Sequence, residues 1–215
     1  MTLDRLSELV QTQALEVFGL CHTIPDDQLG EGTLALLGPH EPGFWQNVQT
    51  APEFGDGAPD PLDRWSARVI TALAHDMGGV PVFPFGAPAR PFISWAVRSG
   101  RAWSSPVGLL VHDRAGLMVS YRGAVLLPEK LPVSAPSDSP CLSCVGQPCL
   151  SACPVGALDA AGYDIPACKA FLDQPDGQSC LSEGCQVRRA CPVSQRYPRE
   201  PAQSAFHMAA FHKPS

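Results

Sequence analysis

Four cysteines stand within thirteen residues of this chain, at Cys141, Cys144, Cys149 and Cys153, and Pro154 follows the last of them. Cysteine is a scarce residue, and packing alone does not call for four thiols in so short a stretch. Thiolates are good ligands for soft metals and for iron–sulfur groups. We therefore expect this stretch to fold so that several thiols converge on a metal, and the rest of the chain has to accommodate that requirement.

The spacing of these cysteines favours an iron–sulfur centre. Bacterial ferredoxins use the run C-x2-C-x2-C-x3-C-P, whose fourth cysteine binds the other cluster in two-cluster proteins. This chain has the same first spacing, the same last spacing and the same final proline, but four residues separate Cys144 from Cys149. Cys149 and Cys153 are four residues apart, so on a short helix both would point to one side, and one could reach each cluster.

Four more cysteines follow, and the last of them is again followed by proline: Cys168, Cys180, Cys185 and Cys191. Two Cys-Pro endings suggest two related halves, in which each half completes the site of the other. Zinc remains an alternative, because Cys141/Cys144 and Cys180/Cys185 both have spacings that zinc knuckles use. The C-x3-C-P ending favours two [4Fe-4S] clusters over zinc.

Charge and composition restrict the partners. The net charge is −6, so nucleic acid and anionic membrane are not expected partners. No apolar run approaches a membrane span, and the acidic N-terminus does not resemble a signal peptide. Nine cysteines are an odd number, which argues against a pure disulfide scaffold. A cytoplasmic location, where thiols stay reduced, is the expectation.

Periodicity predicts an α+β chain with three parts: an α/β domain over 1–130, a cluster domain over 131–197 and a tail helix over 198–215. The stretch 127–140 is rich in proline and serine and is expected to be a linker. The expected elements are an opening helix over 3–20, strands over 33–38 and 80–85, helices from 61 and over 92–98, and a hairpin over 107–127.

A family resemblance covers about residues 92–197. The segments PCLSCVGQPCLSACPVGAL, IPACKAFLDQ and GCQVRRACPVSQR resemble the ferredoxin-like half of epoxyqueuosine reductases and of their corrinoid-reductase relatives. The resemblance implies one cluster held by Cys141, Cys144, Cys149 and Cys191, and another held by Cys153, Cys168, Cys180 and Cys185. It also implies that the N-terminal domain is nitroreductase-like and binds cobalamin beside the clusters, and that the second domain is bacterial-ferredoxin-like.

The chain also departs from this family, which makes it a truncated and divergent relative. Cys180-x4-Cys185-x5-Cys191 is looser than the family's C-x2-C-x3-C-P. The N-terminal part is shorter, its catalytic acid motif is not found, and the helical repeats associated with transfer RNA are missing. Epoxyqueuosine reductase itself is therefore not the expected activity.

Other residues have weaker claims to a site. Cys21 and His22 form a Cys-His pair with no metal-binding partner nearby in sequence, so a buried thiol at the end of a helix is the preferred interpretation. Aromatic side chains that could line a pocket are individually better explained as core: Phe44, Trp45, Trp65, Phe83, Phe85, Trp95, Trp103 and Tyr121. No nucleophile set or pair of acids identifies catalytic residues.

The sequence thus predicts an iron–sulfur electron-transfer protein with two [4Fe-4S] clusters. It would be a reductase component that passes electrons to a small molecule or cofactor held by residues 1–130, with cobalamin as one candidate. The expected partner is an electron-donor protein of the flavodoxin or ferredoxin type. Two alternatives stay open, namely an electron relay without a substrate of its own and a structural metal-binding protein.

Overall fold

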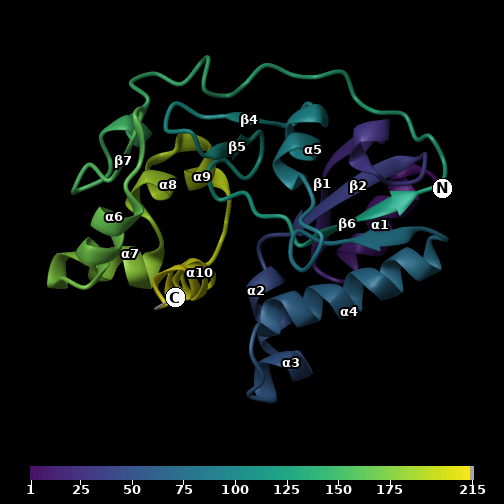
Figure 1. Cartoon of the computed structure of the whole chain (residues 1–215), viewed down its shortest axis with the longest axis horizontal. Coiled ribbons are helices and arrows are strands. Elements are labelled where there is room, and N and C mark those ends of the chain that lie inside the picture. Colours follow the sequence, from purple (N-terminus) through teal and green to yellow (C-terminus); the bar gives the residue numbers. More distant parts are fainter. Residues whose placement is uncertain (214–215) are drawn as a thin grey trace. The chain divides into compact units, whose positions relative to one another are not determined.

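An antiparallel sheet of four strands, ordered β1-β2-β6-β3, organises residues 1–101 and 120–137 (Figure 1). The structure is a computed structural model and describes residues 1–213. The strands are β1 (Leu15–His22), β2 (Thr33–Pro39), β3 (Val80–Val82) and β6 (Gly123–Leu127). All seven residues of β2 are buried, as expected for a central strand whose residues are almost all apolar.

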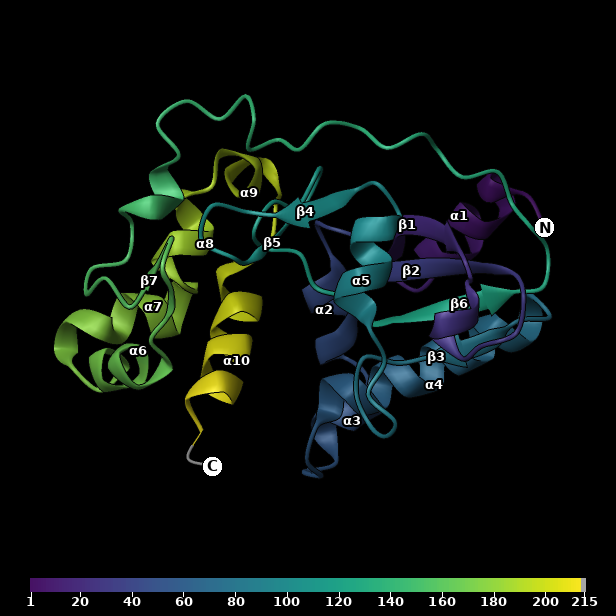
Figure 2. The ribbon, with the colours of Figure 1, turned by 45° about the horizontal axis from the view of Figure 1, so that its top comes forward.

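Helices surround this sheet. They are α1 (Leu3–Gln11), the 3-10 turn η1 (Pro25–Asp27), α2 (Phe44–Gln49), α3 (Pro52–Gly55), α4 (Pro61–Asp76) and α5 (Phe92–Arg98). The longest, α4, packs on β3 and β6, and α5 packs on β1. Figure 2 shows the arrangement of these helices around the sheet.

Two glycines show that α4 and α5 cover opposite faces of the sheet. A Cβ at Gly19 would strike Ser99, directly after α5, and would touch Leu36. A Cβ at Gly123 would meet Ile70 of α4 instead. Gly123 pairs with Leu37, the neighbour of Leu36, and successive strand residues face opposite sides. The side chain of a larger residue would therefore separate either helix from the sheet.

Of the described residues, 102–119 and 138–213 form the second compact unit. Its strands form two small antiparallel pairs, β4 (Ala102–Ser104) with β5 (Leu110–His112), and β7 (Leu158–Asp159) with β8 (Gly162–Tyr163). Its helices are η2 (Pro148–Leu150), α6 (Ile165–Leu172), η3 (Pro175–Gly177), α7 (Gln178–Glu183), α8 (Gln186–Ala190), α9 (Pro192–Arg196) and α10 (Pro201–His212).

Cysteines belong to the core of this second unit. Cys149 and Cys191 are buried together with five apolar residues, namely Val107, Val111, Leu117, Leu158 and Val187. Three further thiols, Cys141, Cys153 and Cys185, pack against the same cluster. The short helices of this unit are therefore arranged around thiols as well as around aliphatic side chains.

Several predicted elements are confirmed. The strand expected over 33–38 is β2, the helix from 61 is α4, the helix over 92–98 is α5, and the tail contains α10. The strand expected over 80–85 is shorter and ends at Val82. Together these elements give a mixed α and β chain, in agreement with the predicted α+β class.

The opening helix predicted over 3–20 is wrong beyond Gln11. The chain turns at Ala14, whose φ is 53°, and residues from Leu15 form β1. Leu15 pairs with Pro39 and His22 with Thr33, so β1 runs along nearly the whole of β2. These long-range backbone hydrogen bonds override the helical spacing of the leucines.

The hairpin predicted over 107–127 is also wrong in its pairing. Only a single bridge joins His112 to Gly116. Beyond it, β5 pairs with β4, whereas β6 pairs with β2 and β3 in the other sheet. The contacts accordingly group residues 102–119 with the second unit, whereas the sequence assigned them to 1–130.

None of the described helices has the length and hydrophobicity that crossing a membrane requires.

Candidate metal centre

The first candidate site is a cavity of about 450 Å³ in the second unit, and four cysteines line it: Cys141, Cys144, Cys149 and Cys191. Cys141 and Cys144 come from the irregular segment that precedes η2, and Cys149 lies within η2. Cys191 sits between α8 and α9, where Pro192 starts the new helix. A proline at the first helical position is favourable, because its missing N–H would have no intrahelical partner. The chain thus changes direction between α8 and α9 at Cys191-Pro192, in the wall of the cavity.

An orphaned hydroxyl also lies in the wall of this cavity. Ser105 is 7% exposed, and within residues 1–213 its Oγ has no hydrogen-bond partner. A buried polar group without a partner costs free energy, so its presence at a cavity suggests a ligand that it can contact. Four cysteines and this serine therefore line the same cavity.

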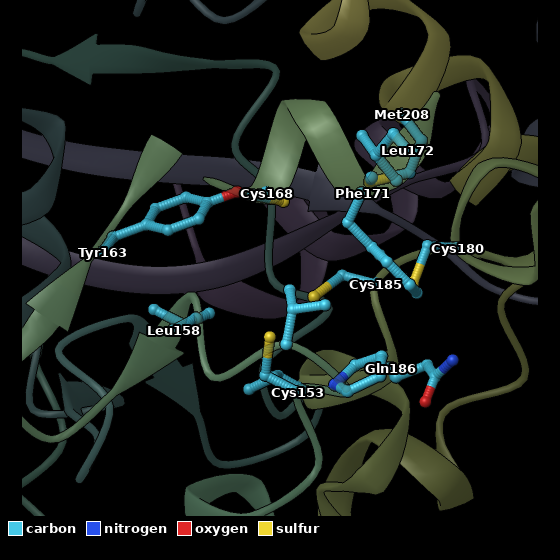
Figure 3. A pocket seen from close by; sticks show the side chains of 13 residues that line it. Cys153, Leu158, Tyr163, Cys168, Phe171, Leu172, Cys180, Cys185, Gln186 and Met208 are labelled. Carbon is cyan, nitrogen blue, oxygen red and sulfur yellow. Dashed lines mark hydrogen bonds between the residues drawn. The ribbon is translucent and has the colours of Figure 1, made fainter. Parts of the chain in front are cut away.

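The second candidate site collects the other four thiols: Cys153, Cys168, Cys180 and Cys185. Figure 3 shows them reaching inward from separate segments, with Cys168 on α6 and Cys180 on α7. Cys185 directly precedes α8. The cavity is narrow, about 20 Å³, which is room for roughly one water molecule. Uptake of a larger group would therefore spread its walls.

Tyr163 is a further member of the second site. Its hydroxyl donates a hydrogen bond to Sγ of Cys168, with an oxygen–sulfur distance of 3.4 Å. Tyr163 is 39% exposed, and its partial burial raises its pKa, with the contact with Cys168 acting in the same direction. The hydroxyl consequently keeps its proton and stays a donor.

The partly buried Arg188 lies near the same thiols. Arg188 on α8 donates a hydrogen bond to the carbonyl oxygen of Leu117. Burial lowers the pKa of Arg188, and the electrostatic influence of Cys185 and Tyr163 opposes that effect. Among the described residues no carboxylate pairs with Arg188, and the hydrogen bond that it donates goes to a backbone carbonyl.

The thiols interact within their own groups. Burial raises the pKa of Cys149, and Cys141 and Cys191 raise it further. Burial likewise raises the pKa of Cys168, with Cys185 and Cys153 adding to the effect against the hydrogen bond from Tyr163. Close thiolates repel one another, so the protonated thiols are favoured, and a cationic metal group would reverse that preference.

Each cavity offers four thiols, the number that the corners of a [4Fe-4S] cubane require. The first cavity, about 450 Å³, has room for such a group, whereas the second, about 20 Å³, would have to widen. Within residues 1–213, no three His, Cys, Asp or Glu side chains are grouped closely enough to hold a single ion. Zinc, whose bonds to thiolate sulfur are about 2.3 Å long, would therefore also require the thiols to move.

The predicted helix carrying Cys149 and Cys153 on one side is wrong. The 3-10 turn η2 ends at Leu150, and Cys153 lies beyond it. Pro154 disfavours a helical conformation at the residue before it. The two thiols consequently face different cavities. The partition into two clusters implied by the family resemblance has the same membership as these two cavities, and ligation itself stays a prediction.

The remaining candidate residues lie elsewhere. Cys21 is buried in β1, where burial raises its pKa and the nearby Arg98 opposes this. The ring of His22 is within hydrogen-bond distance, 2.9 Å, of the carbonyl oxygen of Leu131. Of the aromatic residues, Phe44, Trp45, Trp65, Trp95 and Tyr121 are buried in the first unit, Phe83 stacks on Phe85, and Trp103 packs against the core of the second unit.

No sequence motif points to Tyr163, Arg188 or Ser105. Tyr163 precedes Cys168 by five residues and Arg188 follows Cys185 by three, spacings that match no ligand motif. Ser105 is distant from the cysteine runs and reaches its cavity only through the β4–β5 pair.

Compared with known proteins, the chain matches no family model, no curated protein and no solved structure.

Proposed function

We propose that this chain is an electron-transfer protein that holds two [4Fe-4S] clusters and acts as a reductase component. The observation that carries the proposal is the division of eight cysteines into two groups of four, each lining its own cavity. The groups interleave in sequence, because Cys153 belongs with three later cysteines and Cys191 with three earlier ones. This is the arrangement by which two-cluster ferredoxins complete each site from both halves of the chain.

The bound clusters would supply one-electron transfer at low potential. The chain's own part is to hold the thiolates, to exclude water and to place hydrogen-bond donors near sulfur. Cys149, Cys180 and Cys191 are each less than 9% exposed, and Leu158 and Val187 pack between the thiols. Such burial is typical of a group that must be shielded from solvent.

The surface beside the first group suits an electron-donor protein of the flavodoxin or ferredoxin type. Leu142 and Val145 flank Cys144 and are 80% and 95% exposed. Redox encounters use small interfaces, and exposed apolar side chains beside a redox centre are suitable contacts for them. The donor would thus approach through the loop that carries Cys141 and Cys144.

The electron acceptor is proposed to be a small molecule or cofactor held by the N-terminal part of the chain, with a corrinoid as one candidate. In this proposal the second unit is the ferredoxin-like domain, and the sheet of the first unit belongs to a nitroreductase-like domain. The support is the resemblance of the cysteine segments together with the α-helical cover on both faces of the sheet.

Anaerobic purification, with iron, sulfide and zinc counted per chain, tests the proposal. About eight irons and eight sulfides are expected, with visible absorbance that bleaches under dithionite. A change of the spectrum on adding cobalamin would support the corrinoid as acceptor, and no change would favour a relay for another protein. Zinc in place of iron, or clusters that do not cycle, would overturn electron transfer in favour of a structural metal.

A further inference from the structure

Tyr163 and Cys168 are held together by local structure at the start of α6. Asp164 caps this helix, with its side chain accepting a hydrogen bond from the N–H of Ala167 at 2.9 Å. The N–H of Cys168 donates to the carbonyl oxygen of Asp164 at 3.0 Å. Tyr163 precedes the cap and ends β8, so its distance from Cys168 is set within six consecutive residues. Both side chains would move together if the cavity widened.

Helix α10 also supports the ring of Tyr163. This ring stacks on Phe211 of α10, with ring centres 6.1 Å apart and planes 15° apart. Lys169 lies over the same Phe211 ring, 5.6 Å from its centre. This stack limits rotation of the tyrosine and keeps its hydroxyl directed at sulfur (Figure 3).

We propose that Tyr163 is a positioning residue whose hydroxyl donates to the cluster ligand Cys168 and thereby raises the reduction potential of the second iron–sulfur centre. The inference rests on the proposed function. A reduced centre carries one more negative charge on its sulfur atoms, so a hydrogen bond to a ligand sulfur stabilises the reduced state more than the oxidised state. One electron enters from the reductant, no bond is broken, and Tyr163 keeps its proton.

Arg188 contributes in the same direction from another element. Arg188 is partly buried, interacts electrostatically with Cys185 and Tyr163, and has no carboxylate partner within residues 1–213. A positive charge there also favours the state with the extra electron, and its partial burial strengthens the interaction. A hydroxyl donor and a positive charge, on different elements, thus act on the same group of thiols.

The experiment is a potentiometric titration, followed by electron paramagnetic resonance, of the full chain reconstituted with iron and sulfide. The variant Tyr163→Phe removes only the hydroxyl. We expect the reduction potential of one centre to become more negative. At the wild-type midpoint, the ratio of reduced to oxidised centre should fall by roughly three- to tenfold. Tenfold corresponds to 59 mV for one electron. The other centre should be unchanged, and repeating the titration in a Cys149→Ala background identifies which centre has moved.

Three further variants keep the result interpretable. Tyr121→Phe removes the same atom from the first unit and should move neither potential. Arg188→Gln should shift the same potential as Tyr163→Phe, and Arg188→Lys, which keeps the charge, should shift it less. Full iron with both potentials unchanged in Tyr163→Phe would overturn this inference alone. A wild-type chain that takes up no iron would overturn the proposed function and this inference with it.

Discussion

Cys149 and Cys153 are four residues apart in the chain, yet they line two different cavities. Cys149 ends up among the first group because η2 turns it into the core beside Val107 and Val111. Cys153 follows two residues of irregular chain and joins Cys168 and the later thiols. The short segment between them is therefore the place where the two proposed clusters come closest in sequence.

The first prediction is that Cys149→Ala and Cys153→Ala each lose about half of the iron, but from different centres. Each cubane needs four ligands, so the loss of one thiolate weakens only the centre to which that thiolate belongs. Iron counts together with electron paramagnetic resonance of the reduced variants would show two different surviving signals. Combining both substitutions should remove nearly all iron.

Cys21→Ala is the matched control for these variants. Cys21 is a buried thiol of the first unit and lies outside both cavities, so its loss should leave the iron content unchanged. Identical surviving signals in Cys149→Ala and Cys153→Ala would contradict the partition. Loss of iron in Cys21→Ala would show that the ninth thiol had been assigned wrongly.

The elements that could be predicted from the sequence are those with strong local signals. The apolar run of β2 and the proline-initiated, amphipathic α4 are examples. The cysteine spacing also identified, as expected metal ligands, the eight cysteines that line the two cavities. These features depend on neighbours in sequence, and a single chain is enough to recognise them.

What could not be predicted depends on pairing between distant segments. Leu15–His22 has leucines at helical spacing, and only its pairing with β2 makes it a strand. The separation of β5 from β6 into different sheets similarly depends on β4 and β2 as partners. Tyr163 and Ser105 gain their roles from where the fold places a hydroxyl, and no spacing rule connects either of them to a thiol.

A second prediction concerns a buried charged group in the first unit. Asp27 is 5% exposed and accepts hydrogen bonds from the indole of Trp95 at 2.7 Å and from Arg98 at 2.5 Å. Asp27→Asn leaves Arg98 without its anion, which should lower the free energy of unfolding by on the order of 3 kcal/mol. Urea unfolding followed by tryptophan fluorescence would measure it, since Trp45, Trp65 and Trp95 lie in this unit. Asp26→Asn, an exposed neighbour, should change little.

Acid should reduce this stabilisation. Burial raises the pKa of Asp27, but the N–H of Ile24, together with Arg98 and Trp95, outweighs burial and holds that pKa below its usual value. A carboxyl with a lowered pKa contributes stability above its unfolded pKa of about 3.9, and the contribution is lost as pH falls towards the folded pKa. The difference between wild type and Asp27→Asn should therefore shrink below about pH 4. A difference that stayed constant into that range would show that Asp27 is not the ionised partner.

The last prediction tests the contact between the residues that follow β5 and helix α9, which begins directly after Cys191. The N–H of Leu117 donates to Oγ of Ser194 at 2.9 Å, and Ser194 lies on α9, three residues after Cys191. Gly116 has a φ of 56°, and a Cβ there would collide with the backbone nitrogen of Ser194. Gly116→Ala should therefore cost about 3 kcal/mol, from left-handed strain and the collision together.

Gly108→Ala is the control for that collision, because Gly108 has a similar φ of 73° and nothing within 4 Å of a Cβ. It should cost only the left-handed strain, about 1 kcal/mol. Hydrogen exchange of the peptide containing Leu117 should accelerate in Gly116→Ala and stay nearly unchanged in Gly108→Ala. Equal exchange in the two variants would mean that Gly116 does not sit against Ser194 in solution. The first cavity would then lose the contact that fixes α9, and with it the position of Cys191.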